Sequence, residues 1–117
     1  MRQDWTYKAT VLRVVDADTL DVELDLGFTV FIRQRLRLVG PGGTYNDASE
    51  TRGAERQMGL AAKAYVESLI DTYPDEVLVR TRRERGKYGR YLAEVEIAGV
   101  DLATSLVENG HGEFLNK

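Results

Sequence analysis

Cysteine is absent from the 117 residues, and histidine occurs once, as His111. Without thiols the chain can form neither disulfide bonds nor thiolate metal sites, and a single imidazole excludes a zinc centre built from several histidines. Any metal ion bound by this protein would therefore need oxygen ligands.

Long apolar runs are missing as well: no stretch of about 18 apolar residues, the length needed to span a membrane, occurs. Residues 1–8 are polar and lack the apolar core of a signal peptide. The sequence as given favours a cytoplasmic protein, although a secreted precursor trimmed of its leader would look the same. Nothing resembles the apolar seam of a dimer, so a monomer is expected.

The charge is unevenly distributed. The formal net charge is −3, but residues 80–90 contain six basic side chains and one acidic one, which leaves the rest of the chain strongly acidic. Net acidity argues weakly against a nucleic-acid-binding protein, whereas the basic cluster still permits a local anion site. An apolar fraction of 43% in a chain of this length predicts one globular domain over residues 1–117.

Alternation of apolar and polar residues predicts three N-terminal strands, over residues 7–15, 20–24 and 28–39. A hairpin turn is expected at residues 25–27. The third segment has the clearest pattern, which places its apolar side chains in the core and its arginines on the opposite face. The apolar set is Phe28, Val30, Ile32, Leu36 and Leu38, and the arginines are Arg33, Arg35 and Arg37.

The period becomes helical over residues 54–70, after a turn-rich loop at 40–53. Two more strands are predicted over residues 77–81 and 91–97, and Asp101 is placed to cap a short final helix that ends at Gly110. Five strands, with one helix between the third and fourth and another at the C-terminus, are typical of an α+β β-barrel of the OB-fold type. Fold alone does not determine function.

Four short segments stand beside these predicted elements: VVDADT at residues 14–19, RLVG at 37–40, DASETRG at 47–53 and KYGRYL at 87–92. In this order and placement they resemble the staphylococcal-nuclease family. Each segment alone is weak evidence, whereas the four in this order are strong, and the resemblance extends over nearly the whole chain. The resemblance implies a five-stranded OB fold and a calcium-dependent phosphodiesterase activity.

The resemblance also implies the calcium ligands. They would be Asp18, Asp47 and the main-chain carbonyl of Ala48, while Asp16 would lie close by and the hydroxyl of Thr19 would support the turn. A hard cation held by carboxylates can neutralise phosphate charge and help to position a water molecule. Taken alone, the same acidic turn would be read as an ordinary solvated turn.

The remaining roles implied by the resemblance concern the substrate. Glu50 would act as general base or orient the water, since a free carboxylate can accept a proton from water. Arg37 and Arg90 would hold the scissile phosphate, because a guanidinium group can donate two parallel hydrogen bonds to it. Lys87 and Tyr88 would contact the nucleotide. The alternative for the arginine face is a solvated sheet surface.

The loop after the third strand departs from the family's pattern, and two alignments are open. Without a gap, the Pro-Gly-Gly sequence at 41–43 stands where the family carries acidic residues, and the site lacks both a metal ligand and the base. With residues 41–45 as an insertion, Asp47 and Glu50 return to those positions. We favour the insertion, because segment 47–53 resembles the family and surface insertions cost little stability.

The sequence therefore predicts a hydrolase: a calcium-dependent nuclease that cleaves single-stranded or frayed DNA, with RNA as a further candidate substrate. Recognition through the phosphate backbone would give little sequence preference. The alternative is a catalytically weakened OB-fold module that binds nucleic acid or a protein without cleavage. A barrel unrelated to nucleic acid is a third possibility. Convergence of Asp47 and Glu50 on Asp18 would distinguish the enzyme from the binding module.

Overall fold

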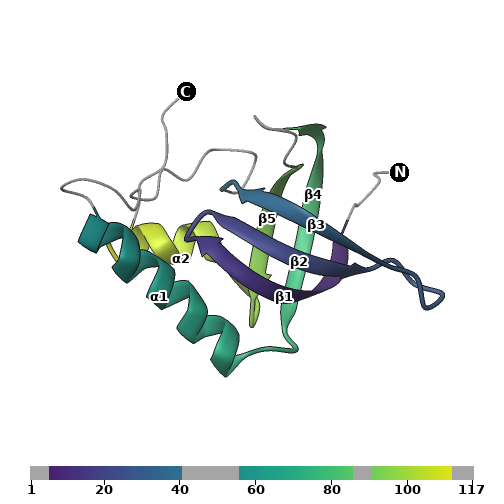
Figure 1. Ribbon diagram of the computed structural model, residues 1–117, viewed down its shortest axis with the longest axis horizontal. Helices are drawn as coiled ribbons and strands as arrows, with labels where there is room; N and C mark the ends of the chain where they lie inside the picture. Colours follow the sequence, from purple (N-terminus) through teal and green to yellow (C-terminus); the bar gives the residue numbers. More distant parts are fainter. Residues whose placement is uncertain (1–5, 41–55, 86–90, 112–117) are drawn as a thin grey trace.

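The computed structural model describes residues 6–40, 56–85 and 91–111 (Figure 1). Two helices accompany the strands. The elements, in chain order, are β1 (Thr6–Asp16), β2 (Thr19–Asp25), β3 (Phe31–Leu38), α1 (Arg56–Thr72), β4 (Val77–Arg85), β5 (Tyr91–Ile97), β6 (Val100–Asp101) and α2 (Leu102–Glu108).

Five strands close a mixed β-barrel. The hydrogen-bonded order is β3-β2-β1-β4-β5, all antiparallel, and a parallel pairing between β3 and β5 joins the two ends. The two-residue β6 pairs antiparallel with the last two residues of β5. Both helices lie at one end of the barrel, and the β2–β3 hairpin projects from the opposite end (Figure 1). Neither described helix combines the length and hydropathy needed to cross a membrane.

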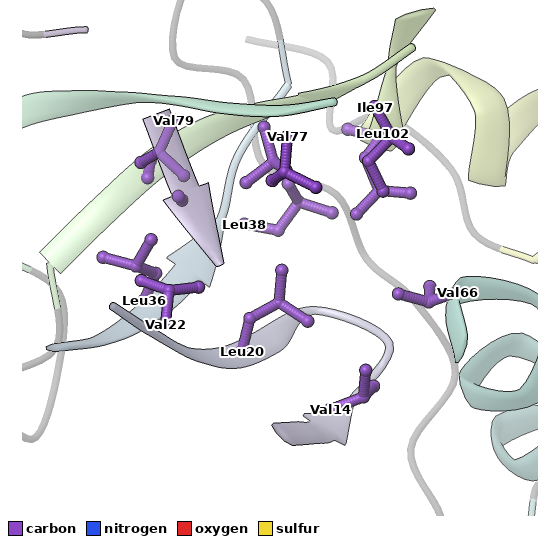
Figure 2. Close-up of a cluster of buried hydrophobic side chains, with 14 of the residues drawn as sticks. Val14, Leu20, Val22, Leu36, Leu38, Val66, Val77, Val79, Ile97 and Leu102 are labelled. Atoms are coloured by element: carbon purple, nitrogen blue, oxygen red, sulfur yellow. The ribbon is translucent and has the colours of Figure 1, made fainter. Parts of the chain in front are cut away.

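The core fills the barrel and the space between the barrel and the helices (Figure 2). Leu20, Leu36 and Leu38 from β2 and β3 are each 1% exposed, and Val66 of α1 and Leu102 of α2 pack into the same cluster. Burying a side chain of this size contributes roughly 1.5–3 kcal/mol. The core therefore couples the end of β3 to both helices, and so fixes the end of the barrel at which β1 turns into β2.

The prediction for the third strand was wrong at its start. β3 begins at Phe31 rather than at residue 28, and the turn spans residues 26–30 rather than 25–27. Gly27, Phe28 and Thr29 all have positive φ (86°, 57° and 60°), and the Val30 amide donates to the Gly27 carbonyl at 3.0 Å. The chain reverses because the Asp25 carboxylate accepts the Gly27 amide at 2.8 Å, a local side-chain contact that competes with strand pairing.

The predicted core row of β3 is therefore buried only in part. Leu36 and Leu38 are buried as expected, but Phe28 is 98% exposed, Val30 49% and Ile32 39%. The reason is the length of the hairpin, which carries these residues past the end of the barrel into solvent (Figure 1). Alternation predicts which face a side chain takes, and it cannot predict whether that face is covered.

The prediction for the last helix is confirmed. The Asp101 carboxylate accepts the Thr104 amide at 2.9 Å, which is the N-cap contact. At the other end, Gly110 has a φ of 79°, its amide donates to the Val107 carbonyl, and the His111 amide donates to the Leu106 carbonyl. This pair of bonds is the Schellman arrangement that ends a helix at glycine.

Candidate functional site

The β1–β2 turn holds the acidic segment in place between two buried residues. Ala17 is 2% exposed and Thr19 4%, so Asp18 between them is held against the barrel. The Thr19 hydroxyl donates to Asp18 Oδ1 at 3.1 Å, and the Leu38 amide donates to the Asp18 carbonyl at 2.8 Å. The turn is thus stabilised by one hydrogen bond within it and by another to the end of β3.

Arg37 reaches this turn from the end of β3. Its Nη2 lies 3.1 Å from Asp18 Oδ2, and the two side chains are only 26% and 15% exposed. Arg37 pairs in register with Thr19 rather than with an acidic residue, so its guanidinium reaches the neighbouring carboxylate at the turn. An ion pair this sheltered from solvent is screened less than one on the open surface.

The other two arginines of β3 have different partners. Arg35 Nε lies 2.7 Å from Asp21 Oδ1, and Arg33 Nε lies 3.5 Å from Glu23 Oε2, each directly across the β2–β3 pairing. The hydrogen bond from Arg35 lowers the pKa of the Asp21 carboxyl and raises the pKa of Arg35 itself. Arg35 is therefore held by Asp21 on β2, whereas Arg33 makes a longer contact and stays 75% exposed, as expected for a solvated sheet face.

The start of β5 lies beside Arg37 on its other side. Leu92 pairs in parallel register with Arg37, Tyr91 pairs with Leu36, and the Val39 amide donates to the Ala93 carbonyl at 2.9 Å. The chain therefore enters β5 and leaves β3 at the end of the barrel that carries the Asp18–Arg37 pair. Segments that are far apart in the sequence meet here because the barrel closes at this point.

The structure brings together four of the ten residues implied by the resemblance: Asp16, Asp18, Thr19 and Arg37. Asp16 ends β1 opposite Thr19, with Ala17 and Asp18 between them. The other six lie outside the described residues: Asp47, Ala48, Glu50, Lys87, Tyr88 and Arg90.

The metal-binding chemistry of the described part of the site is limited to carboxylates. Asp16 and Asp18 are both partly buried, and oxygen donors of this kind suit a hard cation such as calcium. Within residues 6–40, 56–85 and 91–111, no group of three or more histidine, aspartate or glutamate side chains is placed to hold a metal ion. The Asp18 carboxylate fits a share of a calcium site, with Asp16 close by, and the remaining implied ligands, Asp47 and the carbonyl of Ala48, fall outside the described residues.

Sequence reasoning missed the acidic partners of the arginine face. Asp21 and Glu23 alternate along β2 with the same period as Arg33 and Arg35 along β3. Because a tight hairpin joins the two strands, this alternation was visible in the sequence as a cross-strand charge ladder. A search of protein-family models finds no match to this chain, and a search of curated proteins finds none either.

Proposed function

We propose that this protein is a calcium-dependent phosphodiesterase of the staphylococcal-nuclease type that hydrolyses nucleic acid with little sequence preference. One observation carries the proposal: the half-buried pair of Asp18 and Arg37 at the closed end of the barrel. The pair sets an oxygen donor for a cation against a guanidinium group for phosphate, and phosphodiester hydrolysis needs both.

The order of the elements supports the OB-fold assignment within this proposal. A meander of three antiparallel strands is followed by α1 and then by the β4–β5 hairpin, and β5 returns to pair in parallel with β3. OB folds are five-stranded Greek-key barrels that bind oligonucleotides over strands two and three and the adjoining loops. The Asp18–Arg37 pair lies at the start of β2 and the end of β3, within that region.

Arg37 is suited to holding a phosphate because its position is already fixed. The contact with Asp18 orients the guanidinium, so less side-chain entropy is lost when a second anion binds. A phosphodiester could accept two parallel hydrogen bonds from it, and the same positive charge would stabilise the extra negative charge of the transition state. Calcium, when bound, would supply further charge neutralisation and help to position the attacking water.

The other residues implied by the resemblance have distinct roles in this mechanism. Glu50 accepts the proton of the attacking water. Arg90 donates hydrogen bonds to the scissile phosphate, closer to the leaving oxygen, while Lys87 and Tyr88 hold the nucleotide by charge and by stacking. These tasks rest on the resemblance of segments 47–53 and 87–92, and the experiment therefore includes one of them.

Hydrolysis of a fluorogenic single-stranded DNA tests the proposal, measured with millimolar calcium, with a chelator, and for the wild type and Glu50→Ala. Calcium-dependent cleavage is expected for the wild type, and a loss on the order of a hundredfold or more for Glu50→Ala. Absence of cleavage by the wild type would contradict an enzyme, and retained DNA binding in that case would favour the non-catalytic module. Cleavage that resists chelation would contradict the metal.

A further inference from the structure

Among the described strands, none pairs with one edge of β3 over about half of its length. β3 pairs with β2 from Phe31 to Arg37, but with β5 only from Leu36 to Leu38. For residues 31–35, none of the described strands pairs with the edge that faces away from β2. An edge of this kind presents backbone N–H and C=O groups to which another strand can bind.

The backbone hydrogen bonds show which residues face the open edge. The Leu38 amide donates toward the β1–β2 turn, and the Val39 amide donates toward β5. Backbone groups alternate between the two sides of a regular strand, and the β2–β3 register is unbroken from Phe31 to Arg37. Arg33 and Arg35 therefore direct their amide and carbonyl groups to the open edge, while Ile32 and Gln34 direct theirs to β2.

The side chains beside this edge are apolar at the first two residues of β3, and arginines follow them. Phe31 is 53% exposed and Ile32 39%, and the Arg33 side chain is 75% exposed. Most natural edges are blunted by short length, proline, bulges or charge. Here Phe31 and Ile32 leave apolar surface available to an incoming strand.

The charges along β3 indicate which kind of strand could pair with its open edge. On its paired side, β3 faces Asp21 and Glu23 opposite Arg35 and Arg33, with apolar residues between them. A strand on the open side would face the same arginines on one side and Ile32 and Gln34 on the other, so acidic residues alternating with apolar ones fit it. A second copy of β3 paired over residues 31–35 would set Arg33 against Arg33, and like charges directly opposite are destabilising.

We propose that the open edge of β3, residues 31–35, binds an extended peptide of alternating acidic and apolar residues by strand addition. Main-chain hydrogen bonds to Arg33 and Arg35 give the affinity, and the guanidinium group of Arg33, which stays 75% exposed at 3.5 Å from Glu23, selects acidic side chains. This edge occupies the first half of β3, whereas Arg37 lies near its end. The inference is independent of the proposed phosphodiesterase activity.

A synthetic peptide with the sequence of residues 20–26, LDVELDL, is the probe, since it repeats the pattern that already pairs with β3. Binding is followed by amide NMR titration of the full chain. Saturable binding is expected, with the largest shifts at the Arg33 and Arg35 amides. In the free protein these two amides should exchange with solvent faster than those of Ile32 and Gln34. Absence of binding up to about 1 mM peptide would overturn the proposal.

Two controls separate strand addition from simple charge attraction. The same peptide N-methylated at alternate residues keeps its charge but loses backbone donors, and it should not bind; equal binding would overturn the proposal.

Arg33→Glu should weaken binding of the acidic peptide by about tenfold or more and should allow binding of a version with lysine in place of each acidic residue. Arg13→Glu, an exposed change on β1, should leave the affinity unchanged. An unaltered affinity in Arg33→Glu, with folding verified by thermal unfolding, would equally contradict the inference.

Discussion

Arg35 and Asp21 face each other across the β2–β3 pairing and form a two-pronged ion pair, with Nε 2.7 Å from Oδ1 and Nη2 3.0 Å from Oδ2. Arg33 and Glu23 repeat the relationship one step along the hairpin. Two of the three arginines in the alternating row are thus bound to their own hairpin. Arg37 differs because its guanidinium contacts the β1–β2 turn.

The first prediction concerns pH. The hydrogen bond from Arg35 holds the pKa of Asp21 below its ordinary value of 3.8, so the pair stabilises the folded state while Asp21 is ionised. That contribution is fully present above about pH 3.8 and is lost as the pH falls through the lower, folded-state pKa. Carboxyl NMR titration should show the pKa of Asp21 rising back toward 3.8 in Arg35→Gln. Arg33→Gln serves as the control and should not produce that rise.

The second prediction separates the arginines by function. Arg37→Ala should reduce phosphodiester cleavage on the order of a hundredfold or more, because it removes the charge that stabilises the transition state. Arg35→Ala, on the same face of the same strand, should retain activity close to that of the wild type, because Arg35 contacts Asp21 within the hairpin and not Asp18 at the β1–β2 turn. Initial rates at fixed calcium measure both variants. Equal losses would indicate that the whole arginine row binds the substrate.

The third prediction concerns the hairpin tip. Phe28 and Thr29 have φ of 57° and 60°, a conformation that bulky and β-branched residues adopt at a cost. Replacing the two with Asn-Gly, the pair preferred where both turn residues have positive φ, should raise the free energy of unfolding by about 1–2 kcal/mol. Phe28 is 98% exposed, so no packing is lost. Urea denaturation measures the change, and a lower midpoint would show that the tip makes stabilising contacts.

The fourth prediction concerns the start of α2. The Asp101 carboxylate accepts hydrogen bonds from both the amide and the hydroxyl of Thr104, each at 2.9 Å. Asp101→Ala should destabilise the fold by about 0.5–2 kcal/mol, the usual cost of losing an N-cap. The exposed Asp75, between α1 and β4, offers a matched control, and Asp75→Ala should change the thermal midpoint little.

Much of the barrel could be predicted from local patterns in the sequence. The strands and the last helix have strong periodic or capping signals, and Asp101 with Gly110 marks the ends of α2. The start of β3 did not follow, because the apolar alternation ran through Phe28 into a turn set by Gly27 and the Asp25 carboxylate. Periodicity has no information on such a competing side-chain contact.

The residues of the candidate site could be predicted from the sequence better than the ion-pair partners of its arginines. The acidic turn and Arg37 were both singled out from the sequence, and the structure sets Asp18 against Arg37. The partners of Arg33 and Arg35 were not anticipated, because pairing depends on the strand register. Register in turn depends on the position of the turn, which was expected at residues 25–27 and spans residues 26–30.

The parallel pairing of β3 with β5 has a consequence for how the chain reaches its folded state. The β1–β2 and β2–β3 hairpins join residues close in sequence, whereas Leu36 and Tyr91, 55 positions apart by their numbers, must meet to close the barrel. Contacts of such high sequence separation carry a larger loop-closure entropy and slow folding. The surroundings of Asp18 and Arg37 are thus completed by a contact far less local than the hairpins that precede it. A partly folded chain could have an intact β1–β3 meander and still lack the enclosed end that the site requires.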